Sequence, residues 1–286
     1  MKKIAKAIAM TGSVLFALNG MHAMAQQAPA AAAPAAAPEP TPEHTFVPKV
    51  SLFTEYEYRG ISQTSEKPAV QLNLDYSHSS GFYLGAFLTN IKWIEDTKKE
   101  LQRANPPASQ FVGGKGSVEL DLFGGYKFEV VKDVTLDLGY LRYEYVGSEA
   151  ITQKPLPTTS FLVLKKPNTD EFYVGISSGA FSAKYSHIVS DAFGLPGTKG
   201  SSFGEINWSQ EVMPKVIVNA HVGRATYKGY VGGNYTVFKI GATYDFGDGW
   251  NAGAYYKDTN ANAPVYTYLG KDWSKGRLVA FVNKSF

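Results

Sequence analysis

The sequence predicts an all-β protein, a transmembrane antiparallel up-and-down β-barrel of about twelve strands. Three observations lead to this prediction. Apolar and polar residues alternate with a period of two from Lys49 onward, the alternating runs are long, and short and long connections follow one another in turn. A strand directs successive side chains to opposite faces, so each run has one apolar and one polar face. No sustained helical period follows residue 25.

The first element is a secretory signal peptide over residues 1–25. Lys2, Lys3 and Lys6 precede an apolar run, and small residues at alternate positions end at Ala25. A positive start, a short apolar stretch and a small-residue cleavage site are typical of a signal that is removed on export. The apolar run is too short for a membrane-spanning helix, which needs ~20 residues.

Removal of the signal changes the charge balance of the protein. The chain has 28 Lys and Arg against 25 Asp and Glu, and three lysines lie in the signal, which leaves 25 of each sign. A net charge of zero argues against nucleic acid as a partner. The absence of cysteine excludes disulfides, thiolate metal sites and cysteine nucleophiles. A mean hydropathy of −0.18 argues against a helical membrane bundle.

The second element, residues 26–48, is a periplasmic tether composed mainly of Ala and Pro. Proline removes backbone donors and alanine offers too little apolar surface for a core, so we expect an extended tether without chemistry. His44 near its end is interpreted as an isolated histidine, not as a metal ligand.

The third element, residues 49–286, is the barrel. Val70, Leu72 and Leu74 alternate with Gln71 and Asn73, and the other runs are similar. Membrane-crossing strands need ~9–11 residues, whereas strands of soluble sheets average ~5–6, so the lengths favour the bilayer over a soluble β-sandwich. The predicted strands span 50–60, 68–78, 82–93, 116–129, 133–146, 169–178, 181–190, 200–212, 215–228, 234–246, 249–258 and 275–286.

The connections fall into two alternating classes. Five are tight, at 78–81, 130–133, 178–180, 212–215 and 247–249. Six are longer, at 61–67, 94–115, 147–168, 191–199, 229–233 and 259–274. An even-stranded barrel with both termini in the periplasm has this arrangement of outer loops and inner turns. Closure is required because an open sheet edge in lipid leaves backbone groups without partners.

Aromatic residues support the same orientation. Two girdles at the lipid–water boundaries are expected, one near the tight turns (Tyr76, Phe82, Tyr126, Phe128, Phe246 and Trp250) and one near the long loops (Tyr56, Tyr58, Tyr140 and Tyr256). The last strand ends in Phe286 and resembles the signal that the outer-membrane assembly machinery of Gram-negative cells reads, although Lys284 departs from it. Outer-membrane lipid and this machinery are therefore the expected partners.

The segment from Tyr56 to Thr64, with Arg59-Gly60-Ile61-Ser62-Gln63 at its centre, resembles the opening motif of the TorF family of porins. The resemblance extends from Val50 to the C-terminus and is most specific in the first two hairpins, which include Leu74–His78 and Gly81–Gly85. It implies a barrel fold and a porin-like activity.

If the apolar parity faces lipid, the opposite parity lines the interior with seven acidic and four basic residues, which predicts a weak preference for cations. The pore-lining candidates are Glu55, Glu57, Arg59, Asp75, Glu119, Asp121, Lys127, Glu129, Asp137, Lys184 and Lys239. An open narrow pore and a barrel plugged by ion pairs both fit about twelve strands. At the first outer turn we expect Gly60 to permit a positive φ and Arg59 to be solvated. The alternative is that Arg59 forms a charged constriction or a lumen-anchoring pair with Glu57 or Asp75.

We therefore expect a channel for passive diffusion of small polar solutes or ions, with no cofactor, no metal and no covalent chemistry. The alternative is a non-conducting barrel with a structural role, or one that binds a surface partner through loops 94–115 and 147–168. A lipid acyl hydrolase is a remote alternative, because Ser186 and His187 are adjacent in a strand and must face opposite sides.

Overall fold

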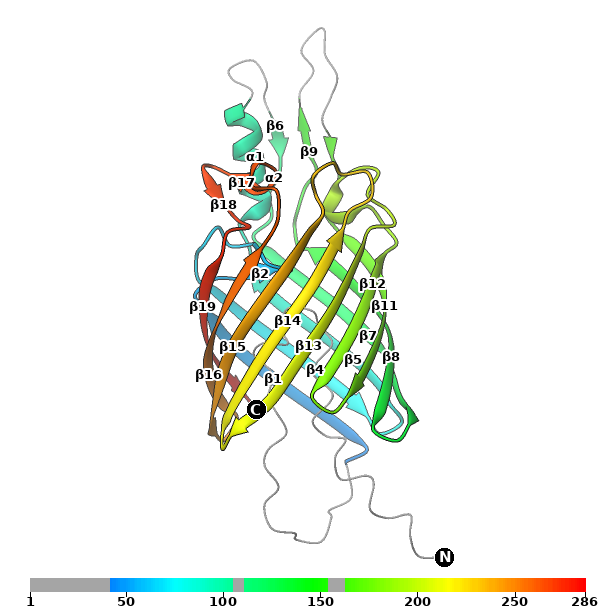
Figure 1. Cartoon of the computed structure of the whole chain (residues 1–286). Coiled ribbons are helices and arrows are strands. Elements are labelled where there is room, and N and C mark those ends of the chain that lie inside the picture. The colour runs from blue at the N-terminus through cyan, green and yellow to red at the C-terminus, as the bar shows by residue number, and fades with distance from the viewer. Residues whose placement is uncertain (1–41, 105–110, 154–162) are drawn as a thin grey trace, which may run out of the picture.

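The computed structural model describes residues 42–104, 111–153 and 163–286, which form a closed, antiparallel β-barrel (Figure 1). The predicted fold class is confirmed. β1 pairs with both β4 and β19, so the sheet has no open edge. The barrel strands are β1 (His44–Phe53), β4 (Ala69–His78), β5 (Phe82–Asn90), β7 (Val118–Val131), β8 (Val134–Tyr145), β11 (Thr169–Ser178), β12 (Phe181–Ile188), β13 (Ser202–Met213), β14 (Val216–Thr226), β15 (Tyr235–Gly247), β16 (Trp250–Thr259) and β19 (Arg277–Ser285). The predicted signal peptide and the tether before residue 42 lie outside the described residues.

The two ends of the barrel differ in the length of their connections. At one end, called here the turn end, β1 starts and β19 finishes, and the strands are joined by turns at 79–81, 132–133, 179–180, 214–215 and 248–249. Asp133, Lys215 and Asp248 have positive φ there, as tight two-residue hairpin turns require. The longer connections lie at the opposite, loop end, at 54–68, 91–117, 146–168, 189–201, 227–234 and 260–276. The predicted alternation of turns and loops is confirmed.

The outer wall of the barrel is apolar and the inner wall is polar. Leu84, Phe172 and Ile240 are exposed on the outside. Glu171 and Lys239, which directly precede Phe172 and Ile240 in the sequence, are buried inside. A soluble sandwich has the opposite polarity. An apolar exterior around a polar interior is the arrangement of a membrane-spanning barrel.

Aromatic side chains border the outer wall at the turn end, where Phe82, Phe246 and Trp250 are exposed, as predicted. Near the loop end the prediction is only partly right. Tyr256 is exposed, but Tyr56 and Tyr58 are buried. They leave the wall because β1 ends at Phe53 and the chain turns into the barrel.

The boundary between tether and barrel also differs from the prediction. β1 begins at His44, not near residue 50, so the last five residues of the predicted tether belong to the first strand. The cause is pairing with β4, whose register starts at His44 opposite His78 and continues to Phe53 opposite Ala69. Pro48 fits this strand because it lies just before the ladder with β19 begins at Lys49, and on that side only its carbonyl is used, as the acceptor of the Phe286 N–H at 3.0 Å.

Short elements cover the loop end (Figure 1). They are α1 (Trp93–Ala104), β6 (Phe111–Gly113), β9 (Ile151–Gln153), β10 (Val163–Leu164), η3 (Ala192–Gly194), α2 (Ala263–Tyr266), β17 (Thr267–Tyr268) and β18 (Lys271–Asp272). Helix α1 was not predicted; Glu95 and Asp96 in its first turn and Arg103 in its last turn suit the helix dipole. Among the described residues, no helix is both long and apolar enough to cross a membrane.

Candidate functional site

Residues 54–68, called here the inward segment, connect β1 to β4 through the interior of the barrel. The segment contains a short hairpin of β2 (Glu57–Tyr58) and β3 (Ile61–Ser62). Every residue from 55 to 65 is buried. Polar and charged groups in such a position need partners, and the opposite walls of the barrel supply them.

The tip of this hairpin is the pair Arg59–Gly60. Their φ angles are 49° and 86°, so both residues adopt the left-handed conformation that a tight hairpin turn requires. A Cβ built on Gly60 would lie 2.6 Å from Thr259 Cγ2 and 2.7 Å from Val237 Cγ2. Glycine is therefore required both by the turn and by the close approach to β15 and β16.

Arg59 joins the inward segment to the far wall. Its Nη2 donates to Glu171 Oε1 at 3.0 Å and to Oε2 at 2.9 Å, and Glu171 lies on β11, which three strands separate from β4. Only 3% of Arg59 and none of Glu171 is exposed. The expectation of a solvated Arg59 is wrong, whereas the alternative of a lumen-anchoring pair is right in kind, with Glu171 as the partner in place of Glu57 or Asp75. A bidentate pair sealed from water holds the hairpin across the interior.

Aromatic rings enclose the same guanidinium. The Cζ atom of Arg59 lies 4.7 Å from the ring centre of Tyr58 and 4.4 Å from that of Phe203 on β13. The Tyr143 hydroxyl donates to Glu171 Oε1 at 3.3 Å. Cation–π contacts and additional hydrogen bonds compensate for part of the cost of removing both charges from water.

Glu57 fastens the base of the hairpin to β15 and β16. Its Oε1 accepts hydrogen bonds from the Lys239 ammonium and, at 3.3 Å, from the Tyr255 hydroxyl. Its Oε2 accepts the N–H of Gly60 at 2.5 Å. The fully buried Lys257 donates to the Gly60 carbonyl at 2.8 Å. The inward segment is thus tied to walls on both sides of the barrel.

Glu119 and Asp121 on β7 form an acidic patch on the inner wall beside the inward segment. Their direct partners on β8 are Tyr145 and Tyr143, and the Tyr56 hydroxyl donates to Glu119 Oε1 at 2.5 Å. Asp121 Oδ1 is buried and accepts no hydrogen bond from the described residues. Tyrosines of β8 and of the inward segment therefore surround these two carboxylates.

Other interior charges pair along the wall. Lys184 on β12 lies 3.2 Å from Glu205 on β13. The Tyr83 hydroxyl donates to Asp137 at 2.7 Å, and Lys127, the cross-strand partner of Asp137, lies over the Tyr83 ring. Lys184 and Glu205 thus form an ion pair, and Lys127 lies near Asp137 with the opposite charge.

The structure places ten of the eleven predicted interior residues on the inner side of the barrel. The inward segment carries Glu55, Glu57 and Arg59, and the barrel strands carry Asp75, Glu119, Asp121, Lys127, Asp137, Lys184 and Lys239. Glu129 is the exception. It is exposed beside the β7–β8 turn, where its carboxylate accepts the N–H of Asp133 at 2.7 Å.

Four buried charges of the barrel strands were missed, namely Lys49, Glu171, Glu205 and Lys257. The alternation that selected Lys184 selects them too, because each is followed in sequence or preceded by an exposed aromatic or aliphatic residue: Val50, Phe172, Ile206 and Tyr256.

The loops at the loop end pack on the inward segment. The N–H groups of Lys92 and Trp93 donate to the Gln63 carbonyl, and the Ser62 N–H donates to the Trp273 carbonyl at 3.0 Å. In the last loop, the Leu269 N–H donates a hydrogen bond to the Glu100 carboxylate of α1 at 2.9 Å. Hydrogen bonds from Arg103 and this N–H hold the pKa of the Glu100 carboxyl below its ordinary value.

The adjacent pair Ser186 and His187 faces opposite sides, as predicted. Ser186 is buried in the interior and His187 is exposed on the outer wall. A hydroxyl and an imidazole separated by the sheet cannot exchange a proton directly.

A family model described as "Bacterial protein of unknown function (Gcw_chp)" matches residues 37–286. None of the curated proteins matches the chain.

Solved structures with a similar fold include "KdgM porin in complex with disordered oligogalacturonate", with 8% identity and a TM-score of 0.49, covering 85% of this chain and 99% of that one. "KdgM porin" has 7% identity and a TM-score of 0.48, covering 85% and 98%. "Salmonella typhi OmpF complex with Daunomycin" has 8% identity and a TM-score of 0.40, covering 85% and 97%. Oligogalacturonate and daunomycin are ligands of those two porins.

Proposed function

The chain belongs to the Gcw_chp family, and from the geometry of its interior we propose that it is a porin-like channel of the outer membrane, narrowed by the inward segment. The observation that carries this proposal is a polar, charged interior inside an apolar wall. Such an interior suits small polar solutes or ions that diffuse passively. In this proposal the barrel wall contacts outer-membrane lipid. The outer-membrane assembly machinery inserts the barrel into the membrane by recognising the strand that ends at Phe286.

The narrower assignment to the TorF family of porins is part of this proposal. The residues that carry the resemblance, Arg59 to Gln63, are the tip of the inward hairpin, its second strand β3 and the residue that follows β3. The motif therefore coincides with the segment that we propose narrows the channel.

A second candidate is a non-conducting barrel. It is favoured by the burial of interior charges, since Glu171 and Lys257 have no exposed surface. An inward segment tied to several walls can close a barrel completely.

One experiment separates the two candidates. The mature protein, reconstituted into a planar lipid bilayer, is expected to give discrete conductance steps smaller than those of a sixteen-stranded porin, because the inward segment fills part of the interior. Absence of discrete steps from wild type and from a variant without the Arg59 anchor contradicts the channel and supports the closed barrel.

The proposed cation preference depends on the acidic patch. Replacing Glu119 with Gln and Asp121 with Asn removes two carboxyl groups that tyrosines surround, so the cation-to-anion permeability ratio is expected to fall toward one. The ratio is measured from the reversal potential across a salt gradient. Glu149→Gln is the control, since this exposed loop residue pairs with Lys115 outside the barrel. If wild type and the double variant have the same cation-to-anion permeability ratio, the acidic patch does not determine the ion selectivity.

A further inference from the structure

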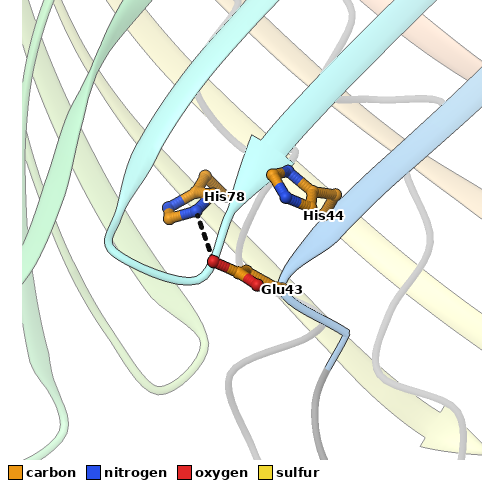
Figure 2. Close-up of side chains that lie close together, drawn as sticks. All are labelled: Glu43, His44 and His78. Carbon is orange, nitrogen blue, oxygen red and sulfur yellow. Dashed lines mark ion pairs between the residues drawn. The ribbon is translucent and has the colours of Figure 1, made fainter.

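Two histidines and a glutamate meet at the turn end of the barrel, on the side opposite the loops. Glu43, His44 and His78 each offer a ligand atom, and these atoms all lie within 4.8 Å of one another (Figure 2). The three residues come from the start of β1 and the end of β4. We propose that this cluster binds a divalent transition-metal ion of the zinc class.

The register of the barrel creates the cluster. His44, the first residue of β1, is the direct cross-strand partner of His78, the last residue of β4. Their ring centres are 5.0 Å apart. Both lie on the outward parity, beyond the apolar band, where water reaches them. Residues directly opposite on an antiparallel pair lie close enough for both side chains to contact one ion.

The backbone also holds Glu43 beside the two rings. Its carbonyl accepts the N–H of Ser79 in the β4–β5 turn at 2.9 Å. Its Oε1 lies 3.4 Å from Nε2 of His78, and the side chain is otherwise exposed (Figure 2). Two ligands on a tetrahedral ion at ~2.0–2.1 Å are separated by roughly 3.3 Å, so this pair already has the spacing of two zinc ligands.

Polar neighbours contact Nδ1 of both rings. His44 Nδ1 lies 2.9 Å from the Tyr76 hydroxyl, and His78 Nδ1 lies 2.6 Å from the Ser80 hydroxyl. The Ser80 backbone N–H also donates to His78 Nδ1 at 3.1 Å, so the neutral ring carries its proton on Nε2 beside Glu43. Metal binding at Nε2 of His78 therefore moves this proton to Nδ1, where the Ser80 hydroxyl can accept it. Zinc-binding histidines usually have such a second contact, which fixes the ring.

The donor set selects the class of ion. Two imidazole nitrogens and one carboxylate oxygen are the ligands of many zinc sites, with water in the remaining position. Imidazole also suits copper and nickel, whereas magnesium and calcium prefer oxygen alone. With neutral histidines the cluster has one negative charge, which attracts a cation. The ion would join β1 to β4 and fix the residue that precedes the barrel.

The test is a zinc titration of the folded protein in detergent, without a polyhistidine tag, followed by isothermal calorimetry. We expect one saturable site per chain. His44→Gln and His78→Gln should each lower the affinity by at least the ~10–100-fold that loss of a second-shell partner causes. His187→Gln is the matched control, because this exposed histidine belongs to no such cluster among the described residues.

A second measurement keeps the outcome clear if a variant folds poorly. Cobalt added to wild type should give the intense visible absorption of a nitrogen–oxygen site with fewer than six ligands, and zinc should abolish it. The electrophoretic shift on heating verifies that each variant is a folded barrel. Equal zinc affinity in wild type and both histidine variants, or no saturable heat in wild type, overturns the proposal and leaves an ordinary Glu43–His78 ion pair.

Discussion

Replacing Arg59 with alanine is expected to raise the single-channel conductance severalfold, because the hairpin of the inward segment loses its anchor on the far wall. The guanidinium is the group that links the hairpin tip to Glu171 on β11. Without it, the hairpin keeps its bonds to β15 and β16 through Glu57 and Gly60, and on the far side it keeps the weaker bond from the Tyr58 hydroxyl to the Tyr143 hydroxyl. The tip can then move toward β15 and β16 and widen the path, which planar-bilayer recordings measure.

The same substitution is expected to destabilise the barrel. Glu171 stays buried without its partner, and an uncompensated buried charge costs about 3–5 kcal/mol. Urea unfolding in lipid vesicles measures this loss. Adding Glu171→Gln removes the unpaired charge, so the double variant should regain much of the stability and keep the raised conductance. That combination separates the mechanical role of the anchor from its electrostatic role.

Arg142→Ala is the control for this experiment. Arg142 also pairs with two acids, Asp170 and Glu144, but it lies partly exposed at the loop end of β8. Its removal should leave the conductance unchanged and cost less than about 1 kcal/mol for each surface pair. If Arg59→Ala and Arg142→Ala give the same conductance, the inward segment does not narrow the path.

The barrel wall could be predicted closely because alternation is a local property. Strand β11 was predicted over 169–178 and observed over Thr169–Ser178, since each residue reveals its face by its own polarity. The same rule located the interior charges. Among the charged residues of the barrel strands it failed for Glu129, which lies past the end of the wall, because parity does not indicate height along the barrel axis.

The course of the inward segment could not be predicted this way. Polar and aromatic residues continue to alternate after Phe53, so the sequence reads as one strand to residue 60. The turn into the barrel depends on partners such as Glu171, which lies 112 positions from Arg59. Local pattern contains no information on such a contact.

The histidine cluster was missed for a related reason. His44 and His78 meet only if the first strand begins at His44, and the Ala- and Pro-rich composition placed that boundary at residue 48. Helix α1, in contrast, could have been found, because its acidic first turn and the 2.9 Å Glu95–Lys99 pair are local signals.

Replacing Gly60 with alanine is expected to disrupt the inward hairpin while the barrel wall remains. A side chain at a φ of 86° is strained by about 1–2 kcal/mol. The new Cβ also meets methyl groups of Thr259 and Val237 at 2.6 and 2.7 Å, and such overpacking costs about 1–3 kcal/mol. Together these terms predict a loss of roughly 2–5 kcal/mol in the free energy of unfolding.

The control for this variant is Gly204→Ala on β13, where an added Cβ meets nothing within 4 Å. It should unfold as wild type does, or slightly later, because alanine has less freedom to lose than glycine. Because the clash in Gly60→Ala displaces the hairpin tip from β15 and β16, it should also disturb the Lys257 bond to the Gly60 carbonyl and change the conductance. Wild-type stability and conductance in Gly60→Ala are incompatible with a hairpin packed tightly against these two strands.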